Sequence, residues 1–68
     1  MEAICMLRLN RWEYNNGGYH TVPLLVNINE ISSVVELEGY VDGSEITMCN
    51  GNRFSVKEST EDITNMIF

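Results

Sequence analysis

The side chains best suited to chemistry in this chain are its single histidine, His20, and its two cysteines, Cys5 and Cys49. A histidine beside a cysteine can take the thiol proton and create a nucleophilic thiolate. The spacing of these three residues has no pattern typical of such a pair. His20 also follows a turn-rich segment, where a histidine is ordinarily a surface residue. We therefore predict that the protein is not an enzyme and has no catalytic residue.

Metal binding is the second chemistry that the residue types allow. One histidine and two distant cysteines lack the clustered spacing of a zinc site. Carboxylates on either side of a glycine-bounded loop, residues 39–43, could hold a hard cation. A solvated acidic face that keeps a small protein soluble accounts for the same residues, and we adopt that interpretation. No glycine-rich phosphate loop is present, so we predict neither a metal nor a cofactor. The carboxylates that could hold such a cation are those of Glu36, Glu38, Asp42 and Glu45.

Aromatic side chains are the clearest candidates for binding a partner. Tryptophan and tyrosine concentrate at the centres of interfaces because they combine a large apolar area with a polar group. The alternative is that these side chains cover one end of a sheet or pack across strands, and the sequence leaves both interpretations open. The predicted partner-binding residues are Trp12, Tyr14, Tyr19 and Tyr40, together with Glu36, Glu38, Asp42 and Glu45.

The charge distribution restricts the kind of partner. Ten acids and four bases give a formal net charge of −6, and no lysine or arginine lies between Arg11 and Arg53. Binding of nucleic acid requires cationic side chains that neutralise phosphates, and attraction to an anionic membrane requires the same sign. We therefore predict neither direct nucleic-acid binding nor membrane binding. An acidic protein can instead imitate nucleic acid and occupy a basic groove on another protein.

The length of 68 residues corresponds to one small domain, residues 1–68. A chain of this size buries only roughly 60% of its unfolded surface, so a second copy or another partner could complete its core. No apolar run reaches the about 20 residues that span a bilayer, and no signal peptide is recognisable. We therefore expect a cytoplasmic protein with Cys5 and Cys49 as free thiols that pack like small apolar residues.

Period-two patterns and turn residues predict the strands that would position these side chains. Residues 3–9 form a nearly continuous apolar run, which is typical of a strand buried on both faces. Residues 15–18 (NNGG) predict the turn of a hairpin with aromatic arms. Residues 21–27 read as extended, and Pro23 places this strand at a sheet edge or at its own start. Residues 32–38 alternate as a half-buried strand.

The last third of the chain carries the most consistent local signals. Residues 44–57 predict a hairpin in which Asn50-Gly51 forms a type I′ turn, with positive φ at both residues. Ser59 and Asp62 predict a capped helix. Ile63, Met66 and Ile67 would form its apolar stripe and seal one end of the sheet. The predicted fold is mainly β, a small five-stranded antiparallel meander or partly open barrel with a short C-terminal helix.

Several short motifs also follow one another in a familiar order. They are residues 7–10 (LRLN), 25–27 (LVN), Ile31, 46–47 (IT), Gly51, 54–59 (FSVKES), Ile63 and Ile67. In this order the chain resembles the flagellar FlbD/SwrD family of small bacterial proteins, relative to which residues 11–23 look like an insertion. The resemblance implies a cytosolic, non-enzymatic accessory protein of bacterial or phage origin, and it carries over no catalytic residue.

These observations favour a protein–protein interaction module that acts as an accessory or regulatory factor and that could form homo-oligomers. The alternative is an acidic inhibitor that mimics nucleic acid or antagonises a host defence protein. Inward-facing residues of the closing hairpin and helix are scaffold, so a working surface is expected in the less regular segments, residues 11–20 and 36–45. The expected scaffold residues are Ile46, Met48, Phe54, Val56, Ile63 and Ile67.

Overall fold

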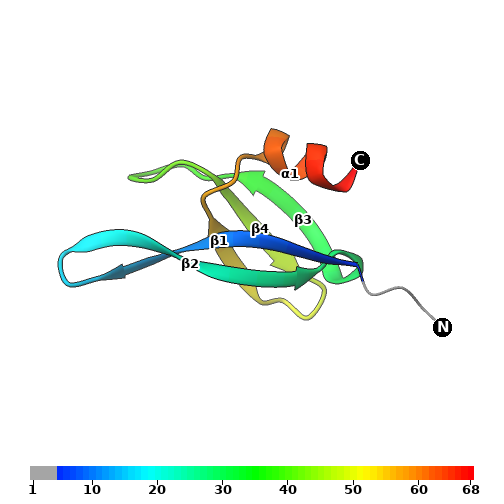
Figure 1. Cartoon of the computed structure of the whole chain (residues 1–68), viewed down its shortest axis with the longest axis horizontal. Coiled ribbons are helices and arrows are strands. Elements are labelled where there is room, and N and C mark those ends of the chain that lie inside the picture. Colours follow the sequence, from blue (N-terminus) through cyan, green and yellow to red (C-terminus); the bar gives the residue numbers. More distant parts are fainter. Residues whose placement is uncertain (1–4) are drawn as a thin grey trace.

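The structure of the protein, a computed structural model, describes residues 5–68 and confirms the mainly β fold with a short C-terminal helix (Figure 1). The elements are β1 (Met6–Asn15), β2 (Gly18–Asn27), the 3-10 turn η1 (Ile28–Glu30), β3 (Ile31–Glu36), β4 (Ser44–Met48), β5 (Arg53–Val56) and α1 (Thr60–Ile67). All five strands pair antiparallel in one open sheet of order β2-β1-β5-β4-β3. Strands that follow one another in the sequence are neighbours in the sheet, except that β2 and β3 do not pair. Instead, the first strand, β1, pairs with the last, β5.

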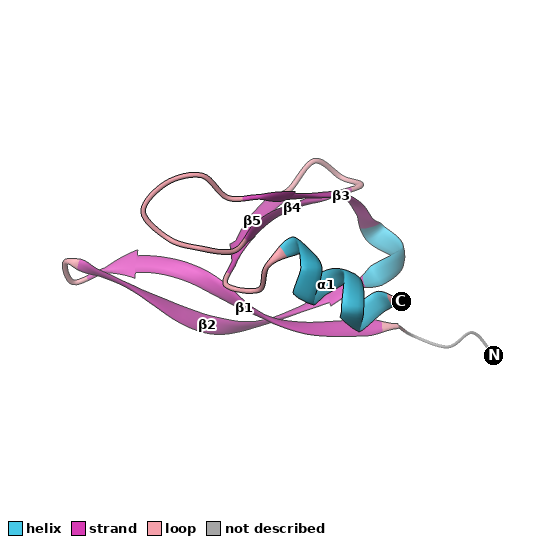
Figure 2. Ribbon diagram, turned by 90° about the horizontal axis from the view of Figure 1, so that it is seen from above, coloured by secondary structure: helices cyan, strands magenta, loops and turns pink. Residues whose placement is uncertain are grey.

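The sheet folds into two layers, which Figure 2 shows edge on. The β1–β2 hairpin forms one layer and β3, β4 and β5 form the other. The layers meet where Arg11 of β1 pairs with Val56 of β5. Beyond that pair, the Lys57 N–H donates to the Asn10 carbonyl oxygen at 2.8 Å. The short β1–β5 contact lets the two layers diverge, and the core lies between them.

The core consists of alternate residues from both layers. Leu9, Ile46 and Val56 are completely buried, and Leu7, Val26 and Ile63 are nearly so. The predicted scaffold residues are confirmed, since each is buried or packs on this cluster. The prediction that residues 3–9 are buried on both faces is wrong for β1, because Met6 is 47% exposed and Arg8 is also exposed. Ala3 and Ile4 lie outside the described residues.

The two asparagine–glycine turns differ from each other. Asn16 and Gly17, between β1 and β2, have φ of 51° and 78°, which is typical of a type I′ hairpin turn. The type I′ prediction for Asn50-Gly51 is wrong, because only Gly51 has positive φ there. Met48 donates to the Asn52 carbonyl oxygen at 2.7 Å and accepts from the Gly51 N–H at 2.9 Å. These bonds define a three-residue loop, a type I turn closed by a left-handed glycine.

The strand β3 shows why strict alternation fails in the middle of the chain. Its pairing with β4 shifts between Ile31 and Ser33. The extra residue lets both Ile31 and Val34 pack on the core. Val35, which follows, is 52% exposed. After β3, Gly43 approaches β5 so closely that a Cβ at this position would overlap the Val56 carbonyl oxygen.

The helix α1 begins as the sequence predicts. The Ser59 hydroxyl oxygen accepts from the Asp62 N–H at 3.0 Å, and the Asp62 carboxylate accepts from the Ser59 N–H at 3.3 Å. Ile63 is buried and Ile67 packs on the core, but Met66 is 48% exposed and so is not part of the buried stripe. In Figure 1, α1 lies beside the end of β3, which it contacts. Figure 2 shows α1 between the two layers, so it covers one side of the space that they enclose.

Candidate interaction surface

The β1–β2 hairpin extends well beyond the core. Each strand has ten residues, and the pairing is regular from Met6 with Asn27 to Asn15 with Gly18. The molecule measures 45 Å along its longest axis and 21 Å across it. Figures 1 and 2 both show the tip of this hairpin and the loop of residues 37–43 projecting from the same end of the molecule.

Three aromatic side chains gather near the hairpin tip on one face of the two strands. Tyr14 pairs with Tyr19, and Trp12 pairs with Thr21, so these side chains share a face. The Tyr14 and Tyr19 rings lie 4.9 Å apart, and the Trp12 and Tyr19 rings 6.3 Å apart, both edge to face. Tyr14 is 62% exposed and Tyr19 is 48% exposed. The cluster therefore packs within itself and still leaves apolar area exposed to solvent.

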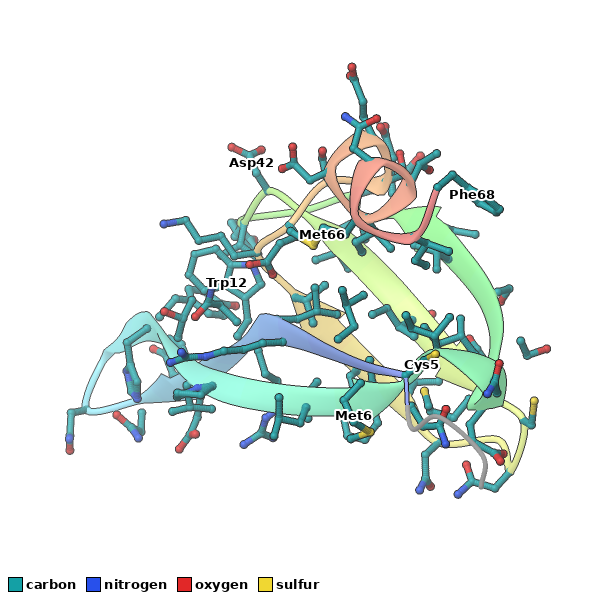
Figure 3. All side chains as sticks on the ribbon, turned by 45° about the vertical axis from the view of Figure 1, so that its right-hand side comes forward. Cys5, Met6, Trp12, Asp42, Met66 and Phe68 are labelled. Atoms are coloured by element: carbon teal, nitrogen blue, oxygen red, sulfur yellow. The ribbon has the colours of Figure 1, made fainter. Side chains whose placement is uncertain are left out.

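Trp12 joins this cluster to the loop between β3 and β4. Its indole Nε1–H donates to the Asp42 carbonyl oxygen at 2.8 Å, across 30 positions of sequence. Figure 3 shows Trp12 on the Asp42 side of β1, whereas Met6, at the other end of the strand, points below the hairpin. Met6 and Trp12 are six positions apart, so their side chains lie on the same face of β1. Because the two-stranded ribbon twists, this face points in different directions at the two ends of the strand.

The loop adds the most exposed of the predicted aromatic residues. Tyr40 is 96% exposed, and it lies two positions before Asp42, which accepts from Trp12. Glu38 and Asp42 are exposed in the same loop. We call Trp12, Tyr14, Tyr19 and the loop of residues 37–43 the aromatic end. The structural interpretation of the aromatic residues applies to Trp12, which is half-buried, whereas the three tyrosines remain exposed.

The remaining acidic candidates do not form one cluster. Glu36 pairs with Ser44 and Glu45 pairs with Val35, so these two carboxylates belong to opposite faces of the β3–β4 pair. The Glu36 carboxylate accepts from the Thr60 hydroxyl at 3.1 Å and so supports the start of α1. Within residues 5–68, no three histidine, cysteine or acidic side chains come close enough to hold a metal ion.

The histidine lies near the tip of the β1–β2 hairpin, and the two cysteines lie near its opposite end. His20 is exposed near the hairpin tip. The Cys5 carbonyl oxygen accepts from the Ile28 N–H, eight positions from His20 and thus about 27 Å along the strand. Cys49 bonds through its N–H to the Glu30 carbonyl oxygen at the same far end. Both thiols are free, as predicted, but both are exposed, so the prediction that they pack like core residues is wrong.

Two residues of the flagellar-type motifs turn out to join distant parts of the fold. The Glu58 carboxylate accepts from the Asn10 backbone N–H at 2.9 Å and from the Asn10 side-chain amide at 2.8 Å. The sequence does not predict this pair, because the residues around Glu58 give no sign that its carboxylate bonds to a strand residue 48 positions away. The contact fastens β1 to the segment that leads into α1.

Comparisons of the chain with family models, with curated proteins and with solved structures found no match. The flagellar-type resemblance therefore rests on the sequence motifs alone. Among the helices described in residues 5–68, none has the length and apolar character needed to cross a membrane.

Proposed function

We propose that this chain is a non-catalytic protein-binding module, an accessory or regulatory factor of bacterial or phage origin that works in the cytoplasm and binds its partner through the aromatic end. One observation carries the proposal. The Trp12–Asp42 hydrogen bond brings together residues 11–20 and 36–45, which are otherwise separate in the sequence. These segments contribute least to the core and hold exposed aromatic side chains, which are the residue types enriched at binding hot spots.

The composition of the aromatic end favours a particular kind of partner surface. Tyr14, Tyr19 and Tyr40 offer apolar area with hydroxyl groups at the periphery, and Glu38 and Asp42 add negative charge beside them. A complementary surface would be apolar at its centre and basic at its edge. The acidic-inhibitor alternative has less support, because Glu36 and Glu45 belong to opposite faces and so do not build one continuous acidic surface.

The proposal is tested by capture of partners from the bacterial host with the wild-type protein and with the double variant Tyr14→Ser, Tyr19→Ser. Phe68→Ser is the matched control, because Phe68 is 94% exposed at the other end of the molecule. We expect the double variant to lose at least about tenfold in affinity for the captured protein, as hot-spot residues do. Phe68→Ser should bind as the wild type does.

Salt separates this proposal from charge mimicry. Binding centred on aromatic side chains should persist at high ionic strength, whereas attraction between separated exposed charges is screened. Affinity that disappears in high salt and with Glu36→Lys, while the double tyrosine variant still binds, would overturn the proposal. Light scattering of the free protein measures its mass and so tests whether a second copy of the chain occupies the aromatic end instead.

A further inference from the structure

A groove lies at the other end of the molecule from the aromatic end, between β2 and the β4–β5 turn. Its volume is about 330 Å³, near the lower limit of ligand-binding pockets. Leu24, Met48 and Phe54 provide partly buried apolar area, while asparagines and Glu30 form the polar part of the lining. In the described part of the chain, the lining consists of Leu24, Leu25, Val26, Asn27, Glu30, Met48, Asn50, Asn52 and Phe54.

The groove adjoins the free edge of the sheet. Among residues 5–68, β2 is the last strand on its side and pairs only with β1. Four consecutive residues of β2, Leu24 to Asn27, line the groove. Side chains alternate between the two faces of a strand, so a groove on one face would be lined by every second residue. Because four consecutive residues of β2 line this groove, the edge of the strand borders it. A ligand in the groove would therefore meet backbone groups.

The directions of these backbone groups follow from bonds at the two ends of the β1–β2 pair. The Ile28 N–H donates to the Cys5 carbonyl oxygen at 3.0 Å, so the even-numbered residues of β2 direct their backbone groups toward β1. The bonds of Asn10 in β1 support this assignment. Its N–H and its carbonyl oxygen both bond to residues on the side of β1 that faces away from β2. Leu25 and Asn27 therefore direct their N–H groups to the free edge, beside the groove.

Pro23 limits how much of this edge can pair with another chain. It has the same parity as Leu25, so its missing N–H falls on the free edge, where a proline is tolerated. A long strand docking along all of β2 would lose a ladder bond at Pro23. This interruption protects the protein against sheet-to-sheet pairing of two copies. It leaves a short stretch, Leu25 to Asn27, available beside the groove.

We propose that this groove binds a short extended segment of a partner protein, which adds to the edge of β2 at residues 25–27 as an extra strand. Backbone bonds to Leu25 and Asn27 would supply affinity, and an apolar side chain would enter between Leu24, Met48 and Phe54. The segment carries lysine or arginine beside its apolar residue, because Glu30 is the one charged residue that residues 5–68 contribute to the lining and the chain has a net charge of −6. This site is separate from the aromatic end.

The test uses the acetylated and amidated pentapeptide KVLVK with the full-length protein and follows backbone amides by NMR. We expect chemical-shift changes centred on the amides of Leu25 and Asn27, with slower hydrogen exchange at both. The peptide EVLVE should bind at least about fivefold more weakly, because its charge repels Glu30. A peptide with proline at the central position should bind more weakly as well, since it lacks one backbone donor.

Two protein variants complete the test. Glu30→Lys should weaken KVLVK and strengthen EVLVE by about fivefold each. Glu61→Lys is the matched control, because it makes the same change in net charge on an exposed residue outside both the groove and the aromatic end. Asn52→Trp should block the groove, and a preserved amide spectrum shows that it still folds. Shifts that map to the aromatic end instead, or no change at Leu25 and Asn27 with millimolar peptide, would overturn the proposal.

Discussion

The closing region of the chain, formed by β4, β5 and α1, packs most of its apolar residues into the core, whereas the β1–β2 hairpin leaves several of its own exposed. In the closing region the inward residues of both strands and of α1 pack on one core, with Ile46 and Val56 completely buried. In the hairpin Leu9 and Val26 serve the same core, yet Tyr14 and Leu25 remain more than half exposed. The difference indicates that the hairpin is longer and more apolar on its second face than the fold requires.

This comparison separates residues that hold the fold from residues free to bind. A small domain has marginal stability, so it has little reason to keep exposed apolar area that adds nothing to the core. Exposed apolar surface of this kind ordinarily marks a contact site. The hairpin contributes to both proposed sites. The loop of residues 37–43 completes the aromatic end at its tip, and the β4–β5 hairpin completes the groove at its base.

Loss of a core side chain should destabilise the protein far more than loss of an exposed side chain of the hairpin. Ile46→Ala removes a completely buried side chain and should lower the free energy of unfolding by about 3 kcal/mol. Leu25→Ala removes a side chain that is 61% exposed and should lower it by less than about 1 kcal/mol. Urea unfolding followed by circular dichroism measures both. Equal losses would mean that the hairpin's second face is part of the core in solution.

A smaller effect is expected where the two regions are fastened together. Glu58→Ala leaves the Asn10 N–H and side-chain amide without their acceptors and should lower the free energy of unfolding by about 2 kcal/mol. Glu58→Gln keeps one amide oxygen as an acceptor, so its loss should be about half as large. Glu38→Ala is the control in the same unfolding assay, because Glu38 is exposed and has no hydrogen-bond partner among residues 5–68. A Glu58→Ala variant as stable as this control would show that the layers are held by packing alone.

The parts of the fold that the sequence predicts are those with local causes. The capping box at Ser59 and Asp62 depends on residues three positions apart, and the inward set of β4 and β5 depends on simple alternation. The Asn50-Gly51 turn was mispredicted because its type depends on loop length, which the Met48–Asn52 pairing sets. The same dipeptide type at Asn16-Gly17 forms the two-residue turn, since Asn15 pairs with Gly18.

The remaining features depend on partners far away in the sequence. Met6, Leu7 and Leu9 are all apolar, so composition alone could not show that β1 buries only one of its faces. The β1–β5 contact and the Asn10–Glu58 pair join residues more than forty positions apart. The aromatic candidates were found by residue type, but their assembly at one end depends on the bond between Trp12 and Asp42. The groove had no sequence signal, because its lining comes from β2, η1 and the β4–β5 hairpin together.

The smallest expected effect concerns the boundary between anchor and contact residue within the aromatic end. Trp12→Phe keeps an aromatic ring but removes the Nε1–H that donates to the Asp42 carbonyl oxygen. Because water can reach this exposed bond, the free energy of unfolding should fall by only about 1 kcal/mol. The amides of residues 37–43 should exchange faster with solvent, since the loop loses its tie to β1.

Tyr14→Phe is the matched variant, because it removes a hydroxyl for which no hydrogen-bond partner is found among residues 5–68. It should leave both the unfolding free energy and the exchange of the 37–43 amides unchanged, while any loss of partner binding would come from the hydroxyl itself. If Trp12→Phe behaves in the same way, the indole hydrogen bond does not position the loop. Trp12 would then belong with the tyrosines as a contact residue, and the aromatic end would be two independent segments instead of one surface.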